Sequence, residues 1–355
     1  MSQRNEKIFP VVFLFLALGI IGSVFSSLWW ISRGTPSSGK AVQPQVGNSI
    51  LPKQSLAKHS ASVLSVAFSQ DALLVASGSY DQAVKIWDPK TGKLQRTFEH
   101  GGRVNSLLVS PDGTQLITGS GDGEIAFWNL ASGQEDAAIA GRSGRIVSLA
   151  LSPDGAYLAS GSSDGTIKIW DLATRREHKT LKASGPPVNS LTFLPTNPQQ
   201  LVSGDQAGKI YHWDLQQPQP INEFQSRSER INSIAVSPDG QWLAGGGYGD
   251  LVRVWDLQTG QLEQSLKGHN FIVSGVAFSP DGKTLASSSF DETVKTWDWQ
   301  QNKTICTLRG HSGFVYDVKF DAEGSALISG GYDGTVKVWD LASSKRPCLA
   351  PDDVS

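Results

Sequence analysis

HNFIVSGVAFSPDGKTLASSSFDETVKTWD, residues 269–298, is one of seven similar stretches in this chain, and its terminal dipeptide decides the fold. Trp followed by Asp or Asn recurs at spacings of 41, 42, 43, 42, 42 and 42 residues. Seven copies at so regular a distance indicate a repeated structural unit. The dipeptides are Trp87-Asp88, Trp128-Asn129, Trp170-Asp171, Trp213-Asp214, Trp255-Asp256, Trp297-Asp298 and Trp339-Asp340.

Each repeat has the sequence pattern of a small antiparallel sheet. Alternating β-branched and small residues precede each Trp, as in Thr166-Ile167-Lys168-Ile169, which is typical of strands. Between them stand tight-turn sequences, Pro-Asp-Gly at 111–113, 153–155, 238–240 and 280–282, and Asp-Gly at 122–123, 164–165 and 333–334. A single four-stranded sheet of this kind cannot bury both of its faces. We therefore expect seven sheets to stack around an axis.

This pattern resembles the WD-repeat β-propeller family over residues 51–342, and the repeated Ser-Pro-Asp-Gly turns resemble bacterial members. The resemblance implies an all-β, seven-bladed propeller of four-stranded antiparallel blades. It says little about function, because the family mostly provides binding platforms of many kinds. Gln54-Ser55-Leu56 repeats Gln264-Ser265-Leu266, so we expect residues 54–56 to complete blade 7 and to close the ring. The residues after Leu341 have a weaker strand pattern.

The N-terminus has a different composition. Residues 8–32 contain no charged residue, and 18 of the 24 residues in 8–31 are apolar. A helix of this length spans about 36 Å, enough for a hydrocarbon core of about 30 Å. We expect a tail at 1–7, a transmembrane signal-anchor helix at 8–32, a flexible linker at 33–50 and a C-terminal tail at 343–355. The alternative is a cleaved signal peptide, whose apolar region is usually shorter.

The positive charges on the two sides of the apolar run are nearly balanced, so they give only a weak indication of its orientation in the membrane. Arg4 and Lys7 precede the apolar run, and Arg33 and Lys40 follow it. A short basic tail before a first span most often stays inside, which favours an extracytoplasmic (periplasmic or lumenal) propeller.

The resemblance also implies a buried hydrogen-bond network in each blade. Its members are a His before the first strand, a Ser or Thr in the second, an Asp in the next turn, and the repeat Trp. Four blades match at every position: His59, Ser77, Asp81 and Trp87 in blade 1; His100, Thr118, Asp122 and Trp128 in blade 2; His269, Ser287, Asp291 and Trp297 in blade 6; and His311, Ser329, Asp333 and Trp339 in blade 7.

Three blades depart from the network pattern. Blade 3 has Ser160, Asp164 and Trp170 but Arg142 in the His position, blade 4 has Ser184 and Ala207 in place of His and Asp, and blade 5 has Arg227, Gly245 and Gly249. A satisfied buried network rigidifies its surroundings, so blades 4 and 5 are predicted to open first.

The sequence offers no catalytic constellation. Four of the six histidines occupy the repeat position, His212 adjoins Trp213 in a strand pattern, and His178 lies in a polar stretch. No HExxH, phosphate-loop or EF-hand motif is present, and Asp-Gly is what tight turns require sterically. We expect neither enzyme activity nor a cofactor or metal ion. Cys306 and Cys348 are not in a CxxC pair and are too few for a four-cysteine zinc site; whether they are free stays open.

Partners of propellers commonly dock on the face that carries the loops before the first strand and after the second. Three loop positions per blade, 21 in all, include three Arg and no Asp, Glu, His or Cys, whereas residues 51–355 carry 27 basic and 32 acidic residues. Aromatic residues at these positions gather on blades 5, 6, 7 and 1, which are contiguous in a closed ring, and such residues beside arginines are typical of binding hot spots. The alternative is that these aromatics only cover the blade rims. The predicted partner-binding residues are Tyr80, Arg103, Arg145, Arg230, Tyr248, Ile272, Phe290, Phe314, Tyr316 and Tyr332.

These features favour a membrane-tethered, non-enzymatic platform that binds partner proteins, among which a membrane complex is one candidate. The alternative is a sensor of a small anionic ligand in the central funnel, suggested by Arg103, Arg145 and Arg230. A formal net charge of −2 gives no reason to expect nucleic acid. We expect the propeller itself to be monomeric.

Overall fold

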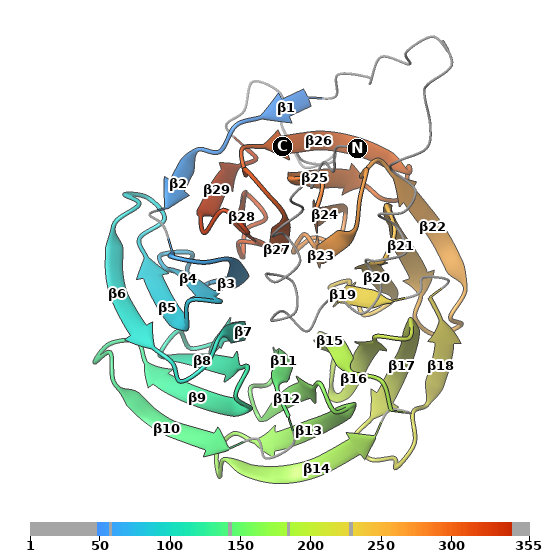
Figure 1. The fold of residues 1–355 in the computed structure, drawn as a ribbon. Coiled ribbons are helices and arrows are strands. Elements are labelled where there is room, and N and C mark those ends of the chain that lie inside the picture. The colour runs from blue at the N-terminus through green and yellow to red at the C-terminus, as the bar shows by residue number, and fades with distance from the viewer. Residues whose placement is uncertain (1–47, 57–58, 141–143, 183–184, 227–229, 343–355) are drawn as a thin grey trace, which may run out of the picture. The chain divides into compact units, whose positions relative to one another are not determined.

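A computed structural model describes residues 48–56, 59–140, 144–182, 185–226 and 230–342. These residues form a closed ring of seven antiparallel β-sheets around a central axis (Figure 1). The seven-bladed β-propeller expected from the Trp spacing is therefore confirmed. The segments 1–7, 8–32, most of 33–50 and 343–355, for which we predict a tail, a membrane helix, a linker and a second tail, lie outside the described residues.

Every blade runs from an innermost strand at the axis to an outermost strand at the rim. Blade 1 contains β3 (Val63–Phe68), β4 (Val75–Ser79), β5 (Ala83–Trp87) and β6 (Leu94–Glu99); blade 2, β7 (Val104–Val109), β8 (Gln115–Ser120), β9 (Glu124–Asn129) and β10 (Glu135–Ala140); blade 3, β11 (Ile146–Leu151), β12 (Tyr157–Ser162), β13 (Thr166–Asp171) and β14 (Arg176–Lys182); blade 4, β15 (Val188–Leu194), β16 (Asn197–Asp205), β17 (Lys209–Asp214) and β18 (Asn222–Gln225); blade 5, β19 (Ile231–Val236), β20 (Trp242–Gly247), β21 (Leu251–Asp256) and β22 (Leu262–Lys267); blade 6, β23 (Val273–Phe278), β24 (Thr284–Ser289), β25 (Thr293–Asp298) and β26 (Lys303–Arg309); and blade 7, β27 (Val315–Phe320), β28 (Ala326–Gly331) and β29 (Val336–Asp340).

The Ser-Pro-Asp-Gly sequences form tight turns between the first and second strands. In blade 3 the Ser152 carbonyl accepts the Gly155 N–H at 2.9 Å, and Asp154 accepts the Ala156 N–H at 3.0 Å. Gly155 has φ +71°, a conformation that favours glycine. These local bonds fix the hairpin register that places the repeat Trp in the third strand.

The hydrophobic core lies between neighbouring blades. One cluster joins Val252 and Leu266 of blade 5 to Val273 and Trp297 of blade 6, and the other clusters repeat this arrangement around the ring. The blades approach closely because glycine recurs in the second strand: a Cβ at Gly330 of blade 7 would lie 2.5 Å from the Val63 side chain of blade 1. Each blade thus buries its faces only against its neighbours.

Ring closure comes from the N-terminal side of the propeller. Strand β2 (Gln54–Leu56) pairs antiparallel with β29 as the outermost strand of blade 7, which confirms the predicted closing strand. Lys337 donates to the Ser55 hydroxyl at 3.0 Å, and Leu56 is completely buried between blades 7 and 1. Burial of one such side chain contributes about 1.5–3 kcal/mol.

A further strand precedes the closing strand. Strand β1 (Asn48–Ile50) pairs in parallel with β26 and gives blade 6 a fifth strand. Residues 48–50, expected at the end of the flexible linker, therefore belong to the propeller. Ile50 packs against the core between blades 6 and 7, which is the physical reason that the segment is ordered as a strand.

The innermost strands are linked by a ring of hydrogen bonds from one blade to the next. A serine in β3, β7, β11, β15 and β19 accepts a backbone N–H of the following blade at 3.1–3.3 Å; the serines are Ser65, Ser106, Ser148, Ser190 and Ser233. At the junction from blade 7 to blade 1 the acceptor is Asp317, whose carboxylate lies 3.1 Å from the Val66 N. Gly275 occupies the position in blade 6, so that junction lacks the bond.

Among the described residues, no helix is long and apolar enough to cross a membrane. Cys306 in β26 is buried and disulfide-bonded.

We predict that Asp317→Ala lowers the free energy of unfolding by about 1–3 kcal/mol, because it leaves the buried Val66 N–H without its acceptor. Asp317→Ser introduces the hydroxyl acceptor that is used at five other junctions, so it should lower the free energy of unfolding by less. Chemical denaturation of both variants measures the difference.

Lys319→Ala provides the control for the ion pair between Lys319 and Asp317, at 3.1 Å. Because the Lys319 side chain is 44% exposed, its removal should cost only about 0–1 kcal/mol. Equal losses for Asp317→Ala and Asp317→Ser would show that the inter-blade bond contributes no stability.

Candidate functional site

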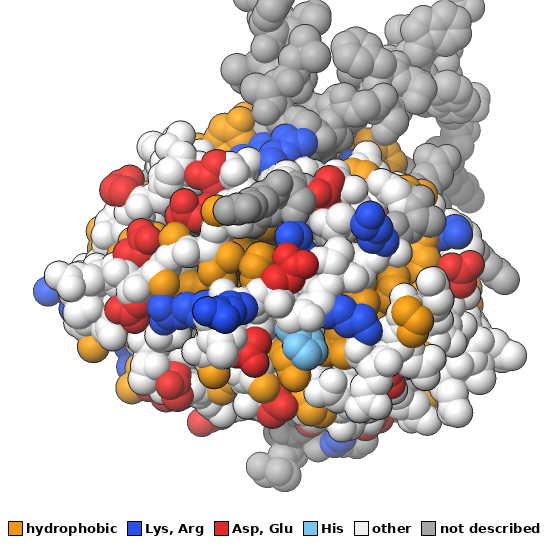
Figure 2. Space-filling view, turned by 90° about the horizontal axis from the view of Figure 1, so that it is seen from below, with side chains coloured by type: hydrophobic (Ala, Val, Ile, Leu, Met, Phe, Trp, Pro, Cys, Tyr) orange, Lys and Arg blue, Asp and Glu red, His pale blue; other side chains and the backbone are white. Residues whose placement is uncertain are grey.

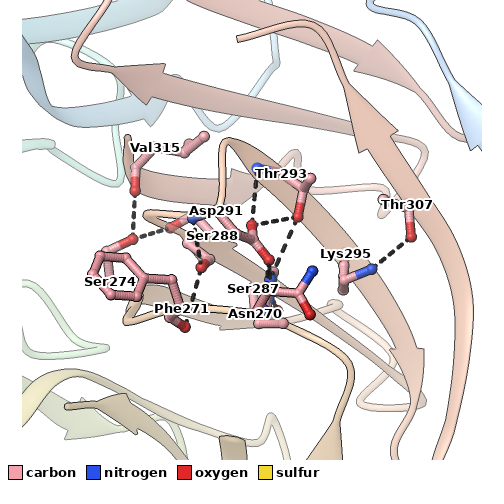
Figure 3. Close-up of polar contacts among 12 residues, drawn as sticks. Asn270, Phe271, Ser274, Ser287, Ser288, Asp291, Thr293, Lys295, Thr307 and Val315 are labelled. Carbon is pink, nitrogen blue, oxygen red and sulfur yellow. Dashed lines mark hydrogen bonds and ion pairs between the residues drawn. The ribbon is translucent and has the colours of Figure 1, made fainter. Parts of the chain in front are cut away.

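Three blades contain a complete buried network of the kind implied by the sequence. In blade 6, His269 lies 2.9 Å from Asp291 through Nδ1 and 2.7 Å from the Ser287 hydroxyl through Nε2. The Trp297 indole N–H donates to the same hydroxyl at 2.8 Å. Figure 3 shows Asp291, Ser287 and the neighbouring Thr293 of this blade.

Blades 1 and 7 repeat this geometry with closely similar distances. The His–Asp and His–Ser contacts are 3.0 and 2.8 Å in both blades, and both Trp–Ser bonds are 2.9 Å. The residues are His59, Ser77, Asp81 and Trp87 in blade 1 and His311, Ser329, Asp333 and Trp339 in blade 7.

Burial controls the ionisation of these networks. It lowers the pKa of His59, His269 and His311, although the neighbouring carboxylates oppose this shift. Burial alone would raise the pKa of Asp291 and Asp333, but their histidine partners and hydroxyl or N–H donors outweigh it and hold both pKa values well below the ordinary range. The networks are therefore neutral imidazoles bonded to carboxylates at neutral pH.

Blade 2 has all four residues but does not assemble the network. Trp128 donates to Thr118 at 2.9 Å, as expected. The Asp122 carboxylate instead contacts Ser120 and the Glu124 N–H. Within the described part of the chain, neither ring nitrogen of the buried His100 has a hydrogen-bond partner.

Blades 3 to 5 retain parts of the network. Trp170 and Trp213 donate to Ser160 and Ser203 at 2.8 Å, whereas Gly245 of blade 5 has no hydroxyl to offer Trp255. The residues in the His position of these blades, Arg142, Ser184 and Arg227, lie outside the described residues.

An aspartate that the sequence analysis missed caps the turn of blade 4. Asp205 accepts the N–H groups of Ala207 and Lys209 at 2.8 and 2.9 Å, and so takes the place of the Asp expected at position 207. Its burial raises its pKa. The sequence did contain a signal for this role: Asp205 follows Ser203-Gly204 directly, at the position that Ser79 occupies in blade 1.

The predicted partner-binding residues all lie in or beside the loops at one end of the blades. In each blade the residue before the turn Asp bonds to the start of the innermost strand, for example Tyr332 N to the Phe314 carbonyl at 2.7 Å and Tyr248 N to the Arg230 carbonyl at 3.1 Å. Ile272 is paired with Phe290 in the same way at 2.9 Å. These positions therefore share one face of the ring, which we call the loop face.

Blades 6 and 7 bring the aromatic residues of the loop face into contact. Phe290 stacks on Phe314, with ring centroids 4.5 Å apart and an angle of 14° between the planes, and meets the edge of Tyr316 at 5.6 Å. Phe314 also contacts Tyr332 at 6.0 Å. Phe271, which the sequence analysis missed, joins Phe290 at 6.4 Å. We call these five residues the aromatic cluster.

The aromatic cluster is accessible to a partner. Phe271, Phe314 and Tyr332 are 49%, 37% and 52% exposed. Contiguous exposed aromatic surface rarely lacks a role in a soluble protein.

Two of the three loop-face arginines, Arg103 on blade 2 and Arg145 on blade 3, lie beyond blade 1 from the aromatic cluster. The Arg103 guanidinium stacks over the Tyr80 ring, 5.6 Å from its centroid. Burial and the nearby positive charge of Arg145 lower the Arg103 pKa. Arg230 is half-buried, and its burial lowers its pKa, with Tyr248 opposing the shift. The structure therefore brings Arg103 and Arg145 near each other, while Arg230 and Tyr248 sit apart on blade 5.

Some other loop-face positions hold blades together. The Asn105, Asn189 and Asn232 side chains donate to the first carbonyl of the next blade's innermost strand at 2.6–3.1 Å, and Ser274 bonds to Val315 in the same way (Figure 3). These residues are structural.

In the described part of the chain, no group of three His, Cys, Asp or Glu side chains could hold a metal ion. His212 bonds to Gln200 at 3.2 Å, and His178 packs on Tyr157. On the rim near β14, basic and acidic side chains are interspersed (Figure 2), in contrast to the segregated residues of the loop face.

The fold and its repeat networks define a WD-repeat β-propeller with one aromatic and cationic face. A family model described as IFT122 first beta-propeller matches residues 45–230, more than half of the chain, and the model for the WD domain, G-beta repeat matches residues 218–256, 260–298 and 302–340. The chain belongs to the WD-repeat propeller family that these models describe.

Similar proteins are complex subunits by name. Over 203 residues the chain is 29% identical to Target of rapamycin complex subunit wat1 of Schizosaccharomyces pombe, covering 56% of this chain and 51% of that protein. It is 27% identical over 179 residues to Target of rapamycin complex subunit LST8 of Bos taurus, with coverages of 49% and 54%. It is 38% identical over 79 residues to Small ribosomal subunit protein RACK1y of Oryza sativa subsp. japonica, with coverages of 21% and 24%.

The chain thus spans about half the length of the first two relatives and about a quarter of the third. All three are eukaryotic and give no support to the resemblance to bacterial members.

We predict that amide hydrogen exchange is slowest in blades 1, 6 and 7 and fastest in blades 4 and 5. The first three have complete networks, and blade 5 lacks the hydroxyl acceptor of its Trp. Mass spectrometry of peptides from the second and third strands measures the difference. Uniform protection around the ring would contradict this prediction.

We also predict that stability falls as the pH drops below 6.5, the ordinary His value, because the unfolded histidines bind protons that His59, His269 and His311 do not bind in the fold. Nearer the ordinary Asp value of 3.8, the unfolded carboxylates bind protons before Asp291 and Asp333 do, which lowers stability further.

Melting temperature measured from pH 8 to pH 5 tests the histidine contribution. Replacing the three histidines by Gln should make the slope shallower whatever it does to the melting temperature itself. A slope as steep as that of the unmodified protein would assign the pH dependence to other groups.

Proposed function

We propose that this protein is a non-enzymatic platform that binds partner proteins through the loop face of its propeller. The aromatic cluster carries this proposal, because exposed, mutually packed aromatic side chains are the usual anchors of protein interfaces. Complete His networks lie in the same two blades, and satisfied buried networks rigidify their surroundings. Preorganisation of this kind lowers the entropic cost of binding.

The comparisons are consistent with this proposal. Two relatives are named as subunits of a target of rapamycin complex, and a third as a protein of the small ribosomal subunit. Proteins of these names work within assemblies, which is the role that we propose for this chain.

We further propose that residues 8–32 tether the protein to a membrane and that the propeller lies on the extracytoplasmic side. The uncharged run of 25 residues supports the tether. The disulfide at Cys306 supports the location, because disulfides persist mainly in oxidising compartments. The sequence contains one other cysteine, Cys348, outside the described residues.

Two substitutions in the aromatic cluster test whether partners bind at the loop face. Phe314→Ser combined with Tyr332→Ser should reduce recovery of partner proteins from native membranes at least tenfold, since each removes an exposed anchor of the aromatic cluster. Recovery is measured by quantitative mass spectrometry with the full chain as bait.

The matched control replaces two leucines of blade 1 that lie at the end of the blade opposite the loop face. Leu73 and Leu94 are 51% and 40% exposed, close to the values of Tyr332 and Phe314. Leu73→Ser with Leu94→Ser should leave recovery unchanged. Equal losses for both double variants, or no loss for either, would contradict binding at the loop face.

The tether and the location are tested separately. The full chain should stay in the membrane pellet after carbonate extraction, and Leu18→Arg with Ile21→Arg should release it, because two charges in the apolar run oppose insertion.

The location is tested by thiol labelling. Protein taken from its native compartment and denatured without reductant should bind no maleimide. After reduction it should bind two maleimides per chain, one for each cysteine. Release of the unmodified chain or two reactive thiols before reduction would contradict the respective proposal.

A further inference from the structure

The loop face carries a continuous arc of side chains whose chemistry changes from apolar to cationic. Starting on blade 6, Phe271 contacts Phe290, which stacks on Phe314 and meets Tyr316 of blade 7. A side-chain hydrogen bond between Tyr316 and Ser62 leads to blade 1, where the Tyr80 N–H donates to the Ser62 carbonyl at 2.9 Å. Tyr80 supports Arg103 of blade 2, and Arg145 of blade 3 lies beyond it.

The cationic end of the arc is not neutralised within the described chain. No salt bridge joins Arg103 or Arg145 to a carboxylate among the described residues. The nearby turn aspartates are occupied: Asp81 by His59 and the Ser60 N–H, and Asp122 by Ser120 and the Glu124 N–H. Two neighbouring arginines without a salt-bridge partner repel each other, and a bound carboxylate relieves that repulsion.

Arg103 is held in place for such a contact. Its guanidinium rests on Tyr80, and its aliphatic part lies across Gly121, where an added Cβ would be only 2.8 Å from Arg103 Cγ. The glycine therefore gives Arg103 the space to lie flat toward blade 1. A guanidinium fixed in this way loses little entropy when it binds a carboxylate.

We infer that the partner of the loop face is an acidic protein segment with an aromatic or aliphatic anchor. The anchor binds the aromatic cluster on blades 6 and 7, and carboxylates of the same segment bind Arg103 and Arg145 on blades 2 and 3. This inference rests on the proposed function and specifies the chemistry of the partner. A folded acidic surface without an anchor would leave the exposed aromatic rings uncovered, and a small anion would use only the arginines.

Selection of peptides from a random 12-residue display library against the full chain in detergent tests the inference. We expect the enriched peptides to combine Asp or Glu with Phe, Trp, Tyr or Leu. Synthetic copies of the most enriched peptides should bind at least tenfold more weakly to Arg103→Glu/Arg145→Glu and to Phe314→Ser/Tyr332→Ser. A second selection against Arg103→Glu/Arg145→Glu should enrich Lys and Arg in place of Asp and Glu.

The control for net charge is Lys90→Glu/Arg176→Glu. Lys90 lies in the turn between β5 and β6, and Arg176 begins β14. Both are exposed at the end of the blades opposite the loop face, so this variant changes the total charge equally without touching the loop face. Binding should change by less than about twofold at physiological salt, because screening acts beyond about 8 Å. Melting temperatures of all variants show whether each remains folded.

The possible outcomes distinguish a wrong partner chemistry from a wrong binding face. Neutral or basic peptides that depend on Phe314 and Tyr332 would overturn the acidic partner and leave the interaction platform standing. Peptides insensitive to all loop-face substitutions, or no enrichment at all, would overturn the face itself. Stabilisation by inorganic phosphate that requires Arg103 and Arg145, together with peptides that ignore both arginines, would overturn the acidic segment in favour of a small anion.

Discussion

Closure of the ring is the constraint on which this structure depends. A single blade exposes apolar residues on both faces, and each blade buries them only against its neighbours. The last junction is made by β2, which comes from the N-terminal side of the propeller and completes blade 7. At the axis the same junction is closed by Asp317, which accepts a backbone N–H of blade 1 where other blades use a serine.

The complete His networks are grouped around this junction. They occupy blades 6, 7 and 1, and the strands β1 and β2 reinforce the rim of blades 6 and 7. The aromatic cluster lies on two of these blades, 6 and 7. Blades with complete networks thus carry the apolar end of the surface to which we assign binding, whereas Arg103 and Arg145 lie on blades 2 and 3, where the network is incomplete.

The sequence was sufficient for the fold because the repeat Trp and the tight-turn residues encode local geometry. The closing strand was also predictable, since Gln54-Ser55-Leu56 repeats a sequence found elsewhere in the chain. Strand β1 was not, because three residues with one buried Ile carry too little pattern to distinguish a strand from a linker. His100 shows another limit: its residue type fits the network, but the Asp122 carboxylate bonds to Ser120 and the Glu124 N–H instead.

The candidate site was predictable in part. The blade positions that face a partner follow from the repeat, and the grouping of aromatic residues on contiguous blades follows from their numbers in the sequence. The stacking of Phe290 on Phe314, the inclusion of Phe271 and the support of Arg103 by Tyr80 depend on side-chain conformations and on distances between blades. The structural use of Asn105, Asn189 and Asn232 has the same origin, because their acceptors belong to the neighbouring blade.

Site-specific photo-crosslinking in native membranes shows directly whether a partner protein binds the loop face. A photoreactive phenylalanine analogue placed at position 314 reports contacts of the loop face, and the same analogue at position 73 reports the opposite end of blade 1. We predict a discrete crosslinked protein from position 314 and none from position 73. A product from position 73 alone, or the same products from both positions, would contradict a partner-binding role for the loop face.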